Sequence, residues 1–151
     1  MAVIVVPGQV AVGDPTPGGP NANSNDKDVH VKVVKLSSAN FTTGGTNTLV
    51  AVLPADSTII SMRTHVKTQL AGGGITAATV ALGTASGGAQ LSAAISAFGA
   101  NGANADITPA VGIMQVYAPP YSADINVWAL GTATTGNPTS GEVFLVINYV
   151  R

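Results

Sequence analysis

The 151-residue sequence contains no cysteine. This absence excludes disulfide bonds, cysteine-ligated zinc sites and thiol nucleophiles. No apolar run approaches the roughly 20 residues that a membrane-spanning helix needs. The short apolar start, 1–6, lacks the basic residues that begin a signal peptide. We therefore expect a protein that is made in the cytoplasm, has no membrane partner and is not exported by a standard signal.

Charge is also scarce, because only 9% of the residues are charged, against about 25% in typical soluble domains. Six Lys and Arg and seven Asp and Glu give a formal net charge of −1. A nucleic-acid-binding surface is clearly basic, so we expect no nucleic-acid partner. So few charges give little repulsion between molecules, which favours a protein that works against other proteins. The alternative is a monomer whose surface consists of Thr, Ser, Asn and Gln.

Residues that could carry out chemistry are few. The G-x-S-x-G motif of serine hydrolases is missing, and neither glycine cluster is followed by the Lys-Ser/Thr of a phosphate loop. Most acids fall at turns or strand ends, where Asp is a turn residue, and Glu142, beside an apolar strand, is the exception. The two histidines, His30 and His65, would form a metal site only with a third ligand such as Asp28; the alternative is that both face water. We predict no enzymatic activity, no cofactor and no metal site.

The chain divides into an N-terminal arm, residues 1–28, and a β-rich domain, residues 29–151. The arm begins with the β-prone apolar run 2–6 and continues through 14–28, where Pro, Gly and Asn dominate. An apolar tip on such a tether is suited to pairing with a neighbour by strand addition. The alternative is a disordered terminus.

The segment Thr58–Gly83 organises the rest of the domain. Side chains alternate from Ser61 to Leu70, which predicts a half-buried strand with Met62, Val66 and Leu70 in the core. Gly72–Gly74 predicts a hairpin turn into a return strand at 79–82. The opposite face of the first strand carries three of the chain's eight Lys, Arg and His residues, and the sequence assigns no acid or third ligand to them. This face either meets a partner or is the solvated side of a sheet.

Short strands with turn residues at intervals of roughly ten predict an all-β fold, an antiparallel β-sandwich or jelly roll of about seven to eight strands. The run 142–150 is apolar on both faces and predicts a central strand. The break in alternation at Val33-Val34 predicts a β-bulge or a strong twist. The spacing of apolar residues in 91–98 predicts one or two helical turns. Residues 99–110 are expected to form a loop, and Trp128 is expected in the core.

Candidate partner-contact residues come from three places: the apolar tip of the arm, the basic face of the strand 61–70, and the aromatic–proline loop 117–121. They are Val3, Ile4, Val5, Val6, Arg63, His65, Lys67, Tyr117 and Tyr121. The same loop, with Trp128, would supply the aromatic faces that a sugar-binding jelly roll needs.

Several segments resemble proteins of tailed-phage virions. They are T-I-I-S-M-R-T-H-V-K-T-Q-L with G-I-T-A-A-T-V-A-L-G-T-A, then L-S-A-A-I-S-A-F, A-D-I-N-V-W-A-L-G-T-A-T-T-G and G-E-V-F-L-V-I-N-Y-V. In this order they are similar to capsid decoration (cement) and head-fibre-type β-sandwich proteins, over residues 29–151. No single residue is diagnostic, so the resemblance transfers no functional residue.

The resemblance implies a bacteriophage structural protein on the outer surface of the virion capsid. Such proteins are often trimers that clamp neighbouring major capsid subunits against internal DNA pressure. We accordingly expect a homotrimer that binds the major capsid protein. The alternatives are another phage structural module, of the tail, baseplate or a fibre, and a glycan-binding jelly roll.

Overall fold

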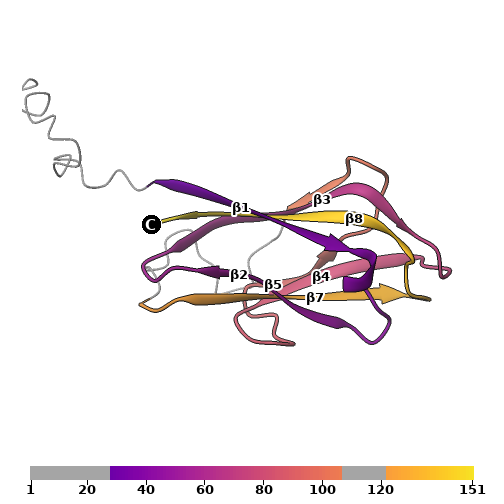
Figure 1. The fold of residues 1–151 in the computed structure, drawn as a ribbon, viewed down its shortest axis with the longest axis horizontal. Helices are drawn as coiled ribbons and strands as arrows, with labels where there is room; N and C mark the ends of the chain where they lie inside the picture. The colour runs from indigo at the N-terminus through magenta and orange to yellow at the C-terminus, as the bar shows by residue number, and fades with distance from the viewer. Residues whose placement is uncertain (1–27, 107–121) are drawn as a thin grey trace, which may run out of the picture.

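The computed structural model describes residues 28–106 and 122–151. This part of the chain folds into eight strands and one short 3-10 helix, arranged in two layers (Figure 1). Among the described residues, no helix is long and apolar enough to cross a membrane. The elements are β1 (Val29–Ser37), η1 (Ser38–Asn40), β2 (Thr46–Leu53), β3 (Thr58–Ala71), β4 (Ala77–Gly83), β5 (Ser92–Ser96), β6 (Asn104–Asp106), β7 (Ile125–Thr134) and β8 (Ser140–Val150).

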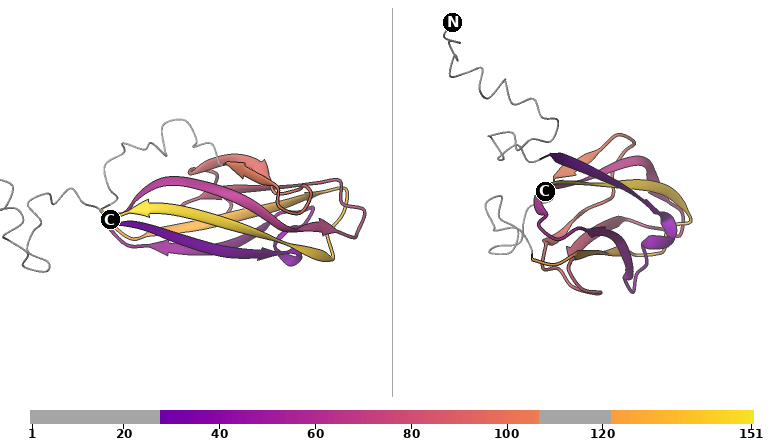
Figure 2. Two further views of the ribbon diagram at one scale, coloured as in Figure 1. Left: turned by 90° about the horizontal axis from the view of Figure 1, so that it is seen from above. Right: turned by 60° about the vertical axis from the view of Figure 1, so that its left-hand side comes forward.

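The strands form two four-stranded antiparallel sheets. Sheet A has the order β1-β8-β3-β6 and sheet B the order β2-β7-β4-β5. The pairing is nested: β1 pairs with β8, β2 with β7, β3 with β6 and β4 with β5. Seen from above, β8 lies between β1 and β3 (Figure 2). The predicted all-β sandwich is confirmed, and the nested strand order is consistent with a jelly roll.

The core lies between the sheets and is filled by alternate residues of each strand. In β7, Ile125, Val127 and Ala129 are buried, whereas their neighbours point outward. β8 is the predicted central strand of sheet A, and its inward side chains Val143 and Leu145 are fully buried. The buried and outward residues of these strands alternate because successive side chains of a strand point to opposite sides.

The predicted hairpin across the glycine cluster is wrong. β3 pairs with β8 and β6, and β4 pairs with β7 and β5, so the two strands belong to different sheets. The connection crosses the sandwich instead of reversing within one sheet. Alternation determines which face of a strand is buried, but it does not determine which strand lies beside it.

The glycine cluster is needed for close packing against the β7–β8 turn. A Cβ on Gly73 would lie 1.9 Å from the carbonyl oxygen of Asn137, and a Cβ on Gly136 would lie 1.8 Å from that of Gly73. Gly73 also has a positive φ of 61°, which L side chains rarely adopt. The backbone amide of Thr139 donates to the carbonyl of Ala71 at 2.8 Å. The two connections thus form one packed unit at this end of the sandwich. By contrast, Gly87 and Gly88 do lie in the hairpin between β4 and β5.

Two other local predictions are corrected by the pairing. Residues 91–98 contain β5 and not helical turns, because the amides of Leu91 and Ala97 donate to β4 carbonyls and hold this segment at the edge of sheet B. β1 shows no bulge, since its register with β8 is continuous from Val29 to Ser37. The break in its pattern arises because β1 has apolar residues on both faces.

Candidate partner-binding surfaces

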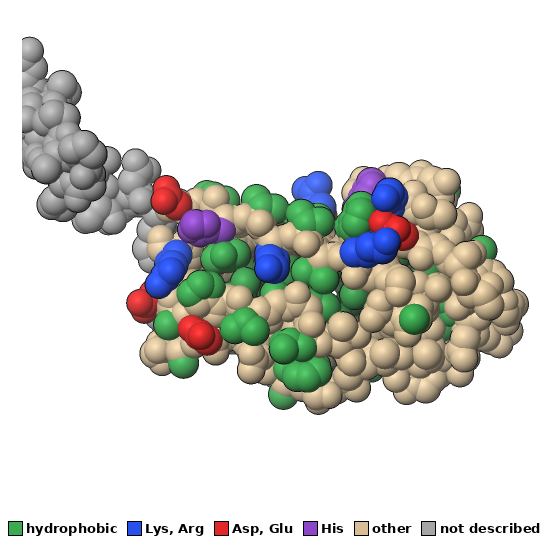
Figure 3. Space-filling view, in the orientation of Figure 1, with side chains coloured by type: hydrophobic (Ala, Val, Ile, Leu, Met, Phe, Trp, Pro, Cys, Tyr) green, Lys and Arg blue, Asp and Glu red, His purple; other side chains and the backbone are tan. Residues whose placement is uncertain are grey.

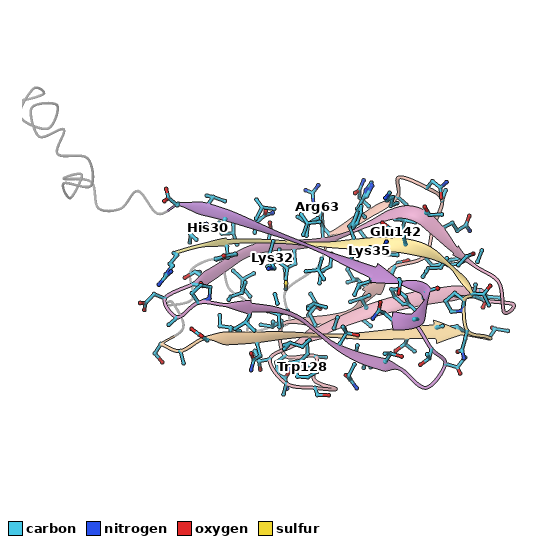
Figure 4. The ribbon with its side chains drawn as sticks, in the orientation of Figure 1. His30, Lys32, Lys35, Arg63, Trp128 and Glu142 are labelled. Carbon is cyan, nitrogen blue, oxygen red and sulfur yellow. The ribbon has the colours of Figure 1, made fainter. Side chains whose placement is uncertain are left out.

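The outer face of sheet A carries Arg63, His65 and Lys67, which we call the basic row. Their neighbours Thr64 and Val66 are buried, so the basic row points away from the core, as the alternation predicted. Figure 4 shows Arg63 projecting outward from sheet A. Contact between the basic row and a partner stays a prediction.

The short strand β6 supplies polar partners for two members of the row. The Arg63 Nε lies 3.7 Å from the Asp106 carboxylate, and the two side chains are 53% and 86% exposed. An ion pair this long and this exposed contributes little to stability. The His65 Nδ1 lies 2.8 Å from the Asn104 Oδ1. The sequence predicted a loop over 99–110 and therefore missed these partners, because a three-residue strand has too short a pattern to detect.

Glu142 lies between two lysines on this face. Its carboxylate is 2.8 Å from the Lys35 Nζ and 3.1 Å from the Lys67 Nζ (Figure 4 labels Lys35 and Glu142). Hydrogen bonds from Lys35 and then Lys67 lower the pKa of Glu142 below its ordinary value of 4.5, because they stabilise the carboxylate. A carboxylate held ionised in this way is not a proton donor near neutral pH. The basic row therefore does have acids beside it. These acids pair with the basic side chains and hold them in place on the surface, which differs from the arrangement that acid–base catalysis needs.

The ring of Phe144 packs against two members of the basic row. Lys67 Nζ lies 5.3 Å from the centroid of the Phe144 ring, and the His65 ring stacks on that ring at 6.4 Å between centroids. A cation over an aromatic face is attracted by the ring quadrupole. Phe144 thus lies on the outer face of sheet A, where it limits the positions available to two members of the basic row.

The two histidines do not meet. His30 pairs in register with Tyr149 and stacks on its ring at 5.1 Å, whereas His65 pairs with Phe144. Tyr149 and Phe144 are an odd number of residues apart on β8, so the histidines extend from opposite faces of sheet A. Within residues 28–106 and 122–151, no group of three His, Asp or Glu side chains could hold a metal ion.

Exposed apolar side chains gather on one side of the sandwich. Strands β1 and β2 are edge strands of the two sheets and contact each other across the gap, as β5 and β6 do on the opposite side. We call the first of these the β1–β2 side. Among the described residues, it carries every exposed large hydrophobic side chain: Val29 (63% exposed), Val31 (59%), Val33 (56%), Leu49 (45%) and Val52 (52%). Figure 3 shows hydrophobic side chains spread over this side, with Lys, Arg, His and acidic side chains between and around them.

We call Val29, Val31 and Val33 the valine row. Alternation places these three residues on one face of β1, and Val34 and Leu36 are the residues of β1 that pack toward the core. The exposure of the row follows from the edge position of β1. Pairing decides which strand lies at an edge, so no local pattern identifies the row as a surface.

Trp128 lies on the outer face of sheet B and not in the core, which corrects the sequence prediction. It is half-buried and pairs in register with the exposed Leu49 (Figure 4). The alternation of β7 requires this placement, because Val127 and Ala129 occupy the inner face. The other predicted contact residues, Val3 to Val6, Tyr117 and Tyr121, lie outside the described residues, as does nearly all of the arm.

Two solved structures contain chains with a similar fold. A chain of the capsid of Ralstonia phage GP4 is 20% identical, with a TM-score of 0.53, over 82% of this chain and 84% of that chain. A chain of the capsid asymmetric unit of cyanophage Pam1 is 18% identical, with a TM-score of 0.56, over 82% of this chain and 85% of that chain. These similarities show a shared fold. No protein-family model and no curated protein matches the sequence.

Proposed function

We propose that this protein is a capsid decoration (cement) protein, a structural component of a phage virion that binds the outer surface of the head and bridges major capsid subunits. The observation that carries the proposal is the fold, which most of this chain shares with chains of two phage capsids. Each comparison covers almost the same share of this chain as of the capsid chain, so those capsid chains are about as long as this one. We further propose, from the resemblance of the sequence, that the protein is a homotrimer on the capsid.

The surface of the sandwich supports a role in assembly. Its exposed large hydrophobic residues lie on two neighbouring edge strands, β1 and β2, and exposed apolar surface is typical of protein-binding sites. The chain has few charges to oppose close association. A protein that binds only the assembled shell stabilises it by mass action, and many copies act together.

The copy number in the virion tests this proposal. We expect quantitative mass spectrometry of purified particles to find the protein in a fixed, high ratio to the major capsid protein. We also expect shells that lack it to lose their DNA at a lower temperature than decorated shells. A few copies per particle would instead indicate the tail, baseplate or fibre, and unchanged heat resistance of undecorated shells would contradict the cement role.

The arm is expected to contribute to capsid binding. Deletion of residues 1–28 should leave a folded sandwich that binds shells more weakly than the full chain, because strands from residue 29 onward build both sheets and supply a packed core. Binding is measured by co-sedimentation with shells, and folding by thermal denaturation. Full-strength binding by the truncated chain would exclude the arm as a contact.

One observation favours a second candidate function, glycan binding. Trp128 lies on the outer face of sheet B beside Leu49, and an aromatic face of this kind can stack on a sugar ring. If the protein binds glycans, Trp128→Ala should abolish the binding, whereas Leu53→Ala, at a buried position, should affect folding instead. A glycan array without any bound sugar excludes this candidate.

A further inference from the structure

We propose that the free edge of β1 accepts residues 2–6 of a second copy of this chain, which add to sheet A as a fifth strand. The inference concerns association of the protein with itself and does not depend on the proposed capsid role. The experiments below use the purified protein alone, so their failure and the failure of the capsid proposal are distinguishable.

β1 offers a regular template for another strand. It is nine residues long, contains no proline and keeps a continuous register with β8 from Val29 to Ser37. It pairs with β8 on one side only and ends the described order of sheet A. Such an edge presents a row of backbone donors and acceptors to another strand. The valine row adds three exposed apolar side chains, 56–63% accessible, along the same strand.

The charges of β1 favour a neutral partner over a second β1. The strand carries His30, Lys32 and Lys35 and no acid, and Figure 4 shows these three side chains along its length. Lys35 is held by Glu142 at 2.8 Å, which leaves the middle of the strand basic. Antiparallel pairing of two β1 strands would bring like charges close together across the interface, which is destabilising.

The segment 2–6 has the properties that this edge requires. Its sequence, A-V-I-V-V, is neutral, free of proline and rich in β-branched residues, which favour strands. Alternate side chains of an added strand point to opposite faces. In the register that continues the outer face of sheet A, Val3 and Val5 therefore lie beside the valine row.

The connecting residues are long enough to carry the segment to another copy. Residues 7–27 lie between the segment and Asp28, which directly precedes β1. Fully extended, these 21 residues span about 70 Å. They include four prolines, Pro7, Pro15, Pro17 and Pro20, and proline favours extended backbone both at its own position and at the residue before it. A tether of this composition is suited to reaching another molecule.

Disulfide trapping tests the proposal directly, because the native chain has no cysteine. Val3→Cys or Val5→Cys is placed in one full-length chain, and Val29→Cys, Val31→Cys or Val33→Cys in a second chain with a size tag. The two are mixed and oxidised. We expect a mixed dimer on a non-reducing gel for at least one combination, since paired strands bring Cβ atoms within the range of a disulfide.

A matched control uses the opposite side of the sandwich. Ala93 is exposed on β5, the edge strand of sheet B farthest from β2. Chains with Ala93→Cys should form mixed dimers with Val5→Cys only at the background rate of random collision. Thermal denaturation of each variant confirms that the sandwich is intact.

Three results would overturn the proposal. The first is cross-linking of Val5→Cys and Val31→Cys only when both are in the same chain, which would place the segment on its own β1. The second is efficient dimerisation of Val31→Cys with itself, which would indicate pairing between two β1 strands. The third is mixed dimers no more frequent than those with Ala93→Cys.

Discussion

Replacement of the valine row by threonine tests the assembly role of β1 without disturbing the fold. Val29→Thr, Val31→Thr and Val33→Thr keep the β-branched shape that suits a strand. Each adds a hydroxyl to a position that is 56–63% exposed in the isolated chain. In the monomer that hydroxyl reaches water, whereas beside an added apolar strand it loses part of its hydration.

The expected magnitude follows from the number of cross-strand contacts. A favourable cross-strand pair is worth roughly 0.2–1 kcal/mol. Val3 and Val5 of the added strand form two such pairs with the valine row, and two pairs at about 0.5 kcal/mol each give a loss of about 1 kcal/mol in the free energy of association. This corresponds to a dissociation constant about fivefold higher. The free energy of unfolding of the monomer should change by less than about 0.5 kcal/mol per site, as for most surface substitutions.

Sedimentation equilibrium measures the dissociation constant between copies, and urea unfolding at a concentration that dissociates them measures monomer stability. The matched control is the triple isoleucine variant at the same positions, because isoleucine keeps both the β-branch and the apolar surface. We expect this control to associate at least as tightly as the native chain.

Two outcomes would refute the reasoning. Unchanged association of the triple threonine variant would show that the valine row is not covered in the assembly. A loss of monomer stability well above 1.5 kcal/mol would show that the row contributes to the core of the isolated fold, in disagreement with its exposure.

Three further predictions concern the scaffold. Glu142→Gln should lower the free energy of unfolding near neutral pH and should flatten its decrease in acid. Because the pKa of Glu142 is lowered in the folded state, the ionised carboxylate stabilises the fold above about pH 4.5, and this stabilisation is lost as the pH falls through the folded-state pKa. Urea unfolding across this pH range measures both effects, and parallel curves for variant and native chain would contradict them. Asp106→Asn should change the free energy of unfolding by less than about 0.5 kcal/mol, because its 3.7 Å pair with Arg63 is exposed; a larger loss would mean that this pair is more than a surface contact. Gly136→Ala should lower the free energy of unfolding by more than about 2 kcal/mol, because its Cβ would overlap the backbone of Gly73, whereas Gly44→Ala, with no atom within 4 Å, should cost far less. Equal melting temperatures of these two glycine variants would refute that account.

The sequence by itself determined the fold class and the orientation of most strand side chains. Period-two alternation placed Met62, Val66 and Leu70 in the core and the basic row outside it, and the structure confirms this. The run 142–150, apolar on both faces, correctly predicted a central strand. These features are local, because a pleated backbone alternates its side chains whatever strand lies beside it.

Tertiary structure alone decided which strands are neighbours and therefore which surfaces the protein presents. β3 and β4 follow each other in the chain but belong to different sheets, and β8 reaches β3 from the far end of the sequence. The acids beside Arg63 and Lys67 come from β6 and β8, so the basic row acquired its partners only on folding. The valine row is exposed because β1 is at an edge, and edge position is a property of the whole sheet. Alternation is encoded residue by residue, whereas pairing depends on contacts between distant segments, which no local pattern specifies.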